Sequence, residues 1–452
     1  MNPPVLAEHG AKLGTTGIKA SRVRTRIMAL IVVSAILTYL DRLNFSFAGK
    51  SIQEEFHLDA QTMGWVLSAF LLGYALTQLP GGWLSDKFGP RRLLVFVIIW
   101  WSIFTAATAL APNLPTARWF GVAWSFAIIR FLIGVGEAPS SPCYNKIVSY
   151  WVGSSHRGFG SSLTLLGIGI GGASTSVLIA WLIYHWGWRF SFYVCGFLGL
   201  CLAATWYFFT TDRPEEHSGV NAAELALIRE DMDTVHIGKR ALTKVPWAML
   251  LKSKSVWALI SGYFCQGFPI YFYHTWFFIY LTKVRGYSVV KGSLWATTPY
   301  IAIALLSPLG GWFSDKCVAR FGLRRGRQRS VWIGMVLSAF FLWFGGQTPT
   351  PYLSILQLAA AAGLNMFAAV SFWAACIDIG GEHAGSLSGL MNTCGNLGGW
   401  LSPIITAYVA THYGWNQAIM TAAVVTLFSA VLWIFVNTED KLPARDPRDQ
   451  IA

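Results

Sequence analysis

Four ionisable side chains stand inside long apolar runs of the sequence, where a charge is costly. Asp41 and Arg42 lie in one run, and Arg130 and Glu137 lie in another. A charge near the centre of a bilayer costs about 2.5–3.5 kcal/mol even on the gentler insertion scales. These groups therefore need charged partners or a water-filled cavity, and we interpret them as a functional site.

The spacing of these residues indicates which of them share a helix face. Arg130 and Glu137 are seven residues apart, so a helix places them on one face, two turns and about 10 Å apart. Tyr39 and Arg42 are three residues apart and also share a face. Asp41 points about 100° away from Arg42.

The residue types suit proton-coupled binding of an anion. A buried carboxyl group can exchange a proton near neutral pH. A guanidinium group stays charged, and its planar fork suits a carboxylate. Protonation of Asp41 or Glu137 would then release an arginine for an anionic substrate. The alternative is that the four charges form two static ion pairs that tie two helices together.

The composition requires a membrane around these residues. The chain has 452 residues, of which 54% are hydrophobic and only 12% charged, and its mean hydropathy is +0.48. Soluble proteins carry about 25% charged residues, so a water-soluble enzyme and a disordered chain are both excluded. The seven cysteines show no disulfide framework and no metal-binding spacing. We expect neither a metal nor another cofactor.

Twelve apolar runs follow one another along the chain, and most are long enough for a helix to cross a bilayer, which takes about 17–25 residues. We expect an all-α integral membrane protein with twelve transmembrane helices in two six-helix, pseudo-symmetric halves. The predicted spans are 27–48, 61–84, 92–111, 121–147, 158–184, 190–209, 255–281, 293–313, 330–346, 352–376, 385–410 and 416–436.

The distribution of positive charge predicts the orientation. With both termini on one side of the membrane, the loops of that side collect most of the 34 lysines and arginines, and positive loops mark the cytoplasm. The net charge of +13 therefore needs no nucleic acid. Asn221 and Glu224 predict a capped amphipathic helix in the central linker. The predicted parts are an N-terminal tail (1–26), two membrane halves (27–209 and 255–436), a cytoplasmic linker (210–254) and a C-terminal tail (437–452).

The two predicted halves repeat one another in sequence. GGWLSDKFGPRR at 81–92 returns as GGWFSDK at 310–316, and a basic segment follows both copies. Glycines and a tryptophan also recur in the same order and spacing. Gly158, Gly171, Gly172, Gly187 and Trp188 correspond to Gly385, Gly398, Gly399, Gly414 and Trp415. Duplicated halves around a central site are typical of secondary transporters.

The motif GGWLSDKFGPRR resembles the signature that the major facilitator superfamily carries between its second and third helices. The resemblance implies a conformational latch, a charge network that holds helix ends and the opposite half together and biases one open state. Its expected members are Gly82, Asp86, Gly89, Arg91, Arg92 and Asp315. Ordinary loop charge is the alternative, but it explains neither the acid after GGWL nor the duplication.

Three segments narrow the resemblance to the anion:cation symporter family, whose members include proton-coupled carriers of hexuronate, glucarate and galactonate. The segments are TYLDRLN at 38–44, SAFLLGYALTQLPGGWLSD at 68–86 and RFLIGVGEAPSSPCYNKIV at 130–148. The resemblance implies that Asp41 and Glu137 carry protons and that Arg130 partners them. It also implies substrate binding by Tyr39, Arg42, Tyr74, Trp373 and Asn392, and the polar aromatic segment QGFPIYFYHTW adds Tyr271.

One position departs from the family pattern. Ile168 stands where sugar-acid carriers have a glutamine, so a donor–acceptor pair suited to hydroxyl groups is missing. Gln266 and His274 in the seventh predicted span partly offset this loss, although His274 is also explained as a structural, hydrogen-bonded histidine. This loss favours a substrate that is less hydroxylated than an aldonate, or an aromatic carboxylate. From the resemblance the expected substrate is still a sugar acid, with phthalate, another aromatic acid or tartrate as alternatives.

We therefore expect a transporter and not an enzyme, which takes up a small carboxylate with protons across a bacterial inner membrane and works as a monomer. A drug/proton antiporter of the same fold is the first alternative. It is disfavoured because buried arginines suit anions. A receptor is the second alternative, but no signalling domain follows the last apolar run.

Overall fold

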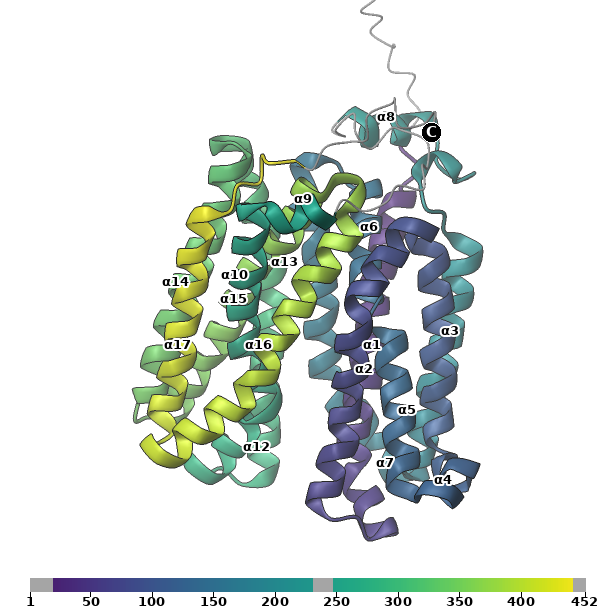
Figure 1. Ribbon diagram of the computed structural model, residues 1–452, viewed down its shortest axis with the longest axis vertical. Helices are drawn as coiled ribbons and strands as arrows, with labels where there is room; N and C mark the ends of the chain where they lie inside the picture. The colour runs from purple at the N-terminus through teal and green to yellow at the C-terminus, as the bar shows by residue number, and fades with distance from the viewer. Residues whose placement is uncertain (1–18, 231–246, 442–452) are drawn as a thin grey trace, which may run out of the picture.

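The computed structural model describes residues 19–230 and 247–441, and every regular element in those two ranges is a helix. Figure 1 shows the long helices as two groups that stand side by side. The first group contains α1 (Val23–Phe56), α2 (Ala60–Phe88), α3 (Pro90–Thr108), α4 (Pro115–Phe120), α5 (Val122–Glu137), α6 (Ser140–Trp151) and α7 (Arg157–Phe209).

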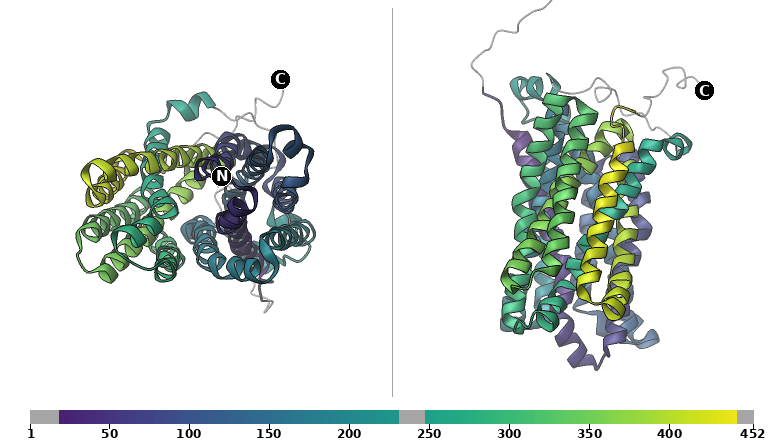
Figure 2. Two further views of the ribbon diagram at one scale, coloured as in Figure 1. Left: turned by 90° about the horizontal axis from the view of Figure 1, so that it is seen from below. Right: turned by 90° about the vertical axis from the view of Figure 1, so that its left-hand side faces the viewer.

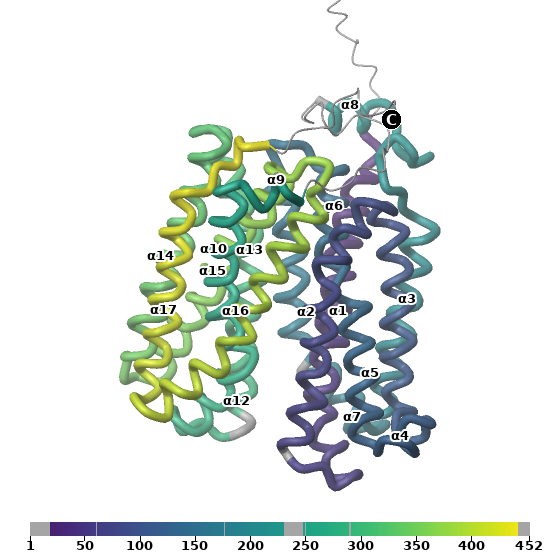
Figure 3. Tube along the Cα trace, viewed as in Figure 1, coloured from purple at the N-terminus to yellow at the C-terminus, as the bar shows by residue number. Residues whose placement is uncertain are grey.

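The second group follows a segment that carries two short helices, α8 (Ala222–Glu230) and α9 (Trp247–Lys252). These two helices lie at one end of the molecule, which we call the linker end (Figures 1 and 3). The second group contains α10 (Lys254–Thr275), α11 (Phe277–Ile279), α12 (Val289–Ala296), α13 (Thr298–Phe321), α14 (Leu323–Gln347), α15 (Pro351–Gly380), α16 (Ala384–Tyr413) and α17 (Trp415–Leu432).

The described helices make this an integral, multi-pass membrane protein. Eight stretches are long and apolar enough to cross a bilayer, and Figure 2 shows that most long helices run along one axis. Large apolar side chains such as those of Phe197, Leu305 and Phe428 lie exposed on the outside of the groups, where lipid replaces water as the neighbour. The expectation of twelve crossings in two halves stays a prediction.

The fourth predicted span, 121–147, is two helices rather than one. α5 ends at Glu137 and α6 begins at Ser140, with Ala138 and Pro139 between them. A proline has no amide hydrogen and disturbs the helix that precedes it, so the break is encoded locally. It leaves Glu137 at the very end of α5, where the helix is interrupted.

Two of the repeated glycines make sharp corners between helices. Gly187 has φ 79° and ψ 165° inside the segment assigned to α7, and Gly414 has φ 97° and ψ 163° between α16 and α17. Only glycine adopts such positive φ values without strain. Each corner is followed by a tryptophan, Trp188 or Trp415, so the sequence repeat corresponds to a repeated turn in the structure.

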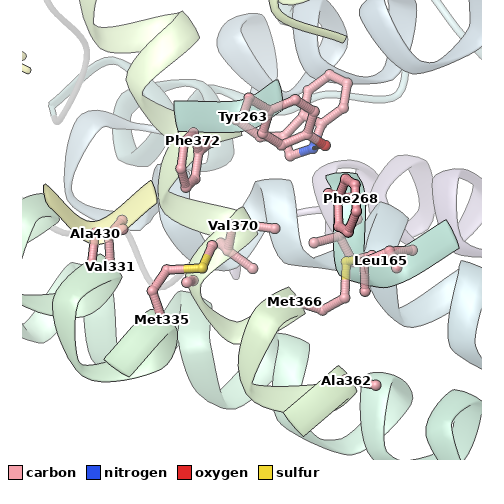
Figure 4. Close-up of a cluster of buried hydrophobic side chains, with 14 of the residues drawn as sticks. Leu165, Tyr263, Phe268, Val331, Met335, Ala362, Met366, Val370, Phe372 and Ala430 are labelled. Carbon is pink, nitrogen blue, oxygen red and sulfur yellow. Dashed lines mark hydrogen bonds between the residues drawn. The ribbon is translucent and has the colours of Figure 1, made fainter. Parts of the chain in front are cut away.

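Each group of helices has its own buried apolar cluster. Phe45, Trp101 and Phe126 belong to the cluster of the first group. The cluster of the second group includes Tyr263 and Phe372, whose ring centroids are 5.3 Å apart (Figure 4). Burial of apolar area is thus concentrated within each group, although a few residues such as Leu165 of α7 join the cluster of the opposite group.

The predicted linker helix forms and is attached to the start of α1. Asn221 accepts a hydrogen bond from the Glu224 amide (2.9 Å), which confirms the predicted cap of α8. The Glu224 carboxylate in turn accepts hydrogen bonds from the amides of Val23 (3.0 Å) and Arg24 (2.8 Å) and from the Ser21 hydroxyl. Burial opposes ionisation of Glu224, but these hydrogen bonds outweigh it and lower the pKa of Glu224. A carboxylate of α8 therefore caps the helix that carries Asp41 and Arg42.

Candidate functional site

A cavity of about 100 Å³ lies between the two groups of helices. Its wall is formed by residues of α1, α2, α6 and α7 from the first group and of α10, α15 and α16 from the second. All six residues expected to bind substrate contribute to this wall, namely Tyr39, Arg42, Tyr74, Tyr271, Trp373 and Asn392. The tertiary structure thus brings together side chains that are more than 350 residues apart in the chain.

Arg42 and Glu137 form an ion pair at this cavity. The Arg42 Nε donates to Glu137 Oε1 at 2.9 Å, and a terminal nitrogen of the same guanidinium contacts the same oxygen. The Arg42 side chain is 20% exposed, whereas that of Glu137 is 1% exposed. The guanidinium also lies against aromatic rings, 4.8 Å from the centroid of Tyr74 and 5.1 Å from those of Tyr39 and Phe70. One arginine thus faces the cavity while a buried acid holds it from behind.

Among the described residues, Arg130 does not form the expected ion pair with an acid. Its guanidinium stacks on Phe45 (4.9 Å) and Phe70 (4.7 Å), and its Nε has no hydrogen-bond partner among the described residues. On α5, two helical turns, a rise of about 10 Å, separate Arg130 from Glu137. In this structure the aromatic rings are thus the neighbours of the Arg130 guanidinium.

Asp41 also lies apart from the arginines, on another side of α1. It is 6% exposed, and its Oδ1 has no hydrogen-bond partner among the described residues. Its neighbours are the Cys195 thiol and the Trp101 indole. The expected rotation of about 100° away from Arg42 explains this placement. Glu137 Oε2 is similarly buried and unpartnered, so each acid keeps an oxygen free to take a proton.

Polar side chains of the second group form a connected wall opposite Arg42. The Tyr271 hydroxyl donates to Asn396 Oδ1 (2.7 Å), and the Asn396 amide donates to the Asn392 carbonyl oxygen (2.8 Å). The Trp373 indole donates to the Tyr263 hydroxyl (2.9 Å). This wall offers neutral hydroxyl, amide and aromatic groups to a bound molecule.

His274 and Ile168, whose roles the sequence did not decide, also lie at the cavity. His274 Nδ1 is 2.8 Å from the Tyr300 hydroxyl, which agrees with a hydrogen-bonded histidine. Ile168 is part of the wall on α7. The missing glutamine is therefore a missing polar group inside the cavity itself.

Asp86 connects the two groups of helices at the linker end. It lies in the last turn of α2 and accepts hydrogen bonds from the amides of Gly385 (3.1 Å) and Ser386 (2.7 Å) in the first turn of α16. Lys146 of α6 lies 3.1 Å from the same carboxylate and donates to the carbonyl oxygen of Glu382. The carboxylate thus caps a helix of the opposite group, where the helix dipole favours a negative charge.

Asp315 makes the equivalent connection in the reverse direction. It lies on α13 and accepts hydrogen bonds from the amides of Gly158 (2.8 Å) and Phe159 (2.7 Å) at the start of α7. Arg327 donates to it at 2.9 Å and also pairs with Asp378 at 3.1 Å. Two acids from matching motifs therefore each cap a helix of the other group.

The arginines of the first motif do not join this connection. The Arg91 amide donates to Asp212 (2.8 Å) and its side chain donates to the carbonyl oxygen of Trp206 (3.4 Å), both in or just after α7. Arg92 is exposed, and Gly89 makes the turn into α3 with φ 89°. Carbonyl oxygens at a helix end attract cations, so Arg91 is held within the first group rather than reaching the second.

Sequence reasoning missed several charged residues that contact the opposite group or pair with the acids that do. Arg157 pairs with Asp378 at 2.9 Å between α7 and α15, and Lys146 and Arg327 complete the two acid clusters. Each lies at or just beyond the end of an apolar run, where charge looks like ordinary loop charge. Only the tertiary structure shows that these residues lie next to the two motifs GGWLSD and GGWFSD.

Comparisons with known proteins agree with this architecture. The family model described as Major Facilitator Superfamily matches residues 31–399 and 292–451. The chain is 31% identical to the "probable galactarate/D-glucarate transporter" of Escherichia coli K12, over 94% of this chain and 97% of that one. It is also 31% identical to "probable anion transporter 1, chloroplastic" of Oryza sativa, over 93% and 77%. A solved proton:xylose symporter superposes with a TM-score of 0.73 at 16% identity, over 93% and 98%, which is a likeness of fold alone.

Proposed function

Because the chain belongs to the Major Facilitator Superfamily and is a secondary transporter of that type, we propose that it takes up a small organic anion together with protons. A sugar acid is the proposed substrate class, since a relative that is similar over nearly its whole length is named for galactarate and D-glucarate. The observation that carries the proposal is the ion pair between Arg42 and Glu137 in the cavity between the helix groups.

The proposed architecture is twelve crossings in two six-helix halves. Ser154–Phe209 and Pro351–Tyr413 contain 56 and 63 residues, and about 20 residues suffice for one crossing, so each supports two. α10 and α13, with 22 and 24 residues, are long enough to add one crossing each. The matching glycine corners and the matching caps of Asp86 and Asp315 support the pseudo-symmetry of the halves.

The proposed cycle starts with proton uptake by Glu137. In its ionised form the acid holds the guanidinium of Arg42. A proton on Glu137 removes that charge, and the donors of Arg42 become available to a substrate carboxylate in the cavity. The rings of Tyr39 and Tyr74 support the guanidinium from its sides. Substrate and proton are thus bound by one unit, and this coupling makes the transport a symport.

In the proposed conformational change, the cavity closes at one end of the molecule and opens at the other. The caps of Asp86 and Asp315 hold the linker end together in the present state. We assign the linker end to the cytoplasm because positive loops mark that side. Loss of both caps then opens the cavity to the cytoplasm, where Glu137 releases its proton and recaptures Arg42. A single chain contains the whole cavity, so we expect the monomer to be the functional unit.

Proteoliposomes that contain the Glu137→Gln variant test this function. Glutamine cannot exchange a proton, so uptake driven by a pH gradient should fall at least a hundredfold, whereas exchange of labelled for unlabelled substrate should persist. The matched control is Glu54→Gln, which changes an acid on α1 whose side chain is 68% exposed. Normal proton-driven accumulation by Glu137→Gln would overturn the assignment of the proton carrier.

A further inference from the structure

The cavity contains a single permanent positive charge among its described wall residues. That charge is Arg42, and the remaining polar wall groups are hydroxyl, amide, indole and imidazole groups. An adjoining apolar cavity with about 1900 Å³ of empty space shares Tyr271 and Asn396 with the first one. Its described wall adds tryptophans such as Trp65 and Trp400 and no charged residue. A bound molecule therefore meets a cation at only one of its ends.

Arg130 and His274 are the two other candidates for a second cation. The first lies outside the cavity wall, and the second is hydrogen-bonded within it. Arg130 does not line the cavity, and the Phe70 ring lies against both Arg130 (4.7 Å) and Arg42 (5.1 Å). His274 makes its hydrogen bond with Tyr300 (2.8 Å) and shares the cavity with the charge of Arg42. Arg130 is therefore not placed to neutralise a second carboxylate, and the hydrogen-bonded His274 adds no permanent charge to the wall.

The charge balance of the site also favours a substrate with one carboxylate. Asp41, Arg42, Arg130 and Glu137 are two acids and two bases, so their charges cancel when all are ionised. If one proton enters with the substrate and binds Glu137 while Asp41 stays ionised, one positive charge remains, and the arginine that faces the cavity carries it. One carboxylate restores neutrality. A second carboxylate would bring an uncompensated negative charge into a poorly solvated site, which is strongly unfavourable.

We propose that this transporter selects monocarboxylates, with the carboxylate on Arg42 and an uncharged end against the wall formed by Tyr271, Asn392, Asn396 and Trp373. The proposal rests on the proposed function and narrows its substrate class. The proposed substrate differs from the acids for which one relative is named, because galactarate and D-glucarate each carry two carboxylates. A proton and a monoanion enter together, so the substrate-loaded site is electrically neutral.

Pairs of acids that differ in one terminal group test the proposal. Gluconate against glucarate and galactonate against galactarate compare a terminal hydroxymethyl group with a carboxylate on the same carbon chain, and benzoate against phthalate does so for an aromatic body. Uptake by wild-type protein in proteoliposomes is measured at pH 7, where the diacids carry two charges. The monoacid of the transported pair should have a kcat/KM at least tenfold above that of its diacid.

The outcomes separate this inference from the proposed function. Proton-driven uptake in which the diacid equals or exceeds its monoacid would overturn the inference and leave the symport function standing. If the wild type transported none of the six acids faster than an Arg42→Gln blank, the proposed function would be overturned, and the inference with it.

A variant that adds a positive charge to the cavity wall provides a second test. Ile168 lines the cavity on α7, so Ile168→Lys adds a second cation, and Ile168→Gln adds a polar group without charge. We expect Ile168→Lys to raise the diacid-to-monoacid ratio of uptake at least fivefold and Ile168→Gln to leave the ratio close to that of the wild type. An unchanged ratio in membrane-inserted Ile168→Lys protein would contradict charge number as the determinant.

Discussion

At the scale of single residues, Arg42 combines two kinds of contact that only an arginine can make together. Its nitrogens donate to the Glu137 carboxylate, and its flat face lies against Tyr74 at 4.8 Å and Phe70 at 5.1 Å. A lysine ammonium is a compact, strongly hydrated point charge without a planar fork. A change of Arg42 to lysine would keep the charge but lose the planar geometry that presents it to the cavity.

The variant Arg42→Lys tests whether geometry matters beyond charge. We expect the KM for the transported acid to rise at least tenfold, which corresponds to about 1.4 kcal/mol of lost binding. The measurement is the substrate dependence of uptake in proteoliposomes. Arg189→Lys is the matched control, because Arg189 forms a partly exposed ion pair with Glu55 far from the cavity. A KM equal to that of the wild type would show that Arg42 acts as a charge only.

At the scale of elements, glycines bring helices of the two groups into backbone contact at the linker end. A Cβ atom added to Gly82 of α2 would overlap the carbonyl oxygen of Gly385 on α16, and one added to Gly385 would lie 2.7 Å from Asp86 Oδ1. Gly158 and Gly311 make the same kind of contact between α7 and α13. Close approach of these helices is what allows each carboxylate to reach the amides of the opposite group.

The variant Gly82→Ala tests this helix contact. The added methyl group must push α2 and α16 apart, so we expect the linker end to loosen and the protein to lose about 1–3 kcal/mol of stability. Thermal unfolding in detergent measures the second effect. Gly64→Ala on the same helix is the control, since an added Cβ meets no atom within 4 Å there. Equal unfolding temperatures of the two variants would contradict the tight contact.

At the scale of the whole molecule, two reciprocal carboxylate caps hold the groups together at one end. Asp86 of the first group caps α16, and Asp315 of the second group caps α7. The central cavity lies between the same groups. A hydrogen bond to a charged group contributes about 1.5–3 kcal/mol, so we propose that the caps set which end is closed and that substrate binding can break them.

The variants Asp86→Asn and Asp315→Asn test these caps. An amide lacks the negative charge that a helix start attracts, so each change should shift the population toward a state open at the linker end at least tenfold. Distances between spin labels on α2 and α16 near that end measure the populations. Glu216→Gln, in an exposed part of the linker, serves as control. Identical distance distributions in all variants would rule out a role for the caps in setting the conformation.

Much of the fold follows from local sequence. Apolar run length alone predicts membrane helices, because a bilayer interior leaves the backbone few other ways to satisfy its hydrogen bonds. The proline that divides α5 from α6 and the glycine corner at Gly187 are also local effects. Ile168, which the resemblance to the anion:cation symporter family singled out, lies at the cavity wall.

The amino-acid sequence by itself determined which charges need a partner or a cavity, because charges such as those of Arg42 and Glu137 are too costly in contact with lipid. Only the tertiary structure decided how they are used. It paired Arg42 with Glu137, left Arg130 on aromatic rings and turned Arg91 back to its own helix group. Periodicity specifies the face on which a residue lies, but the choice of partner depends on which distant helix packs against that face.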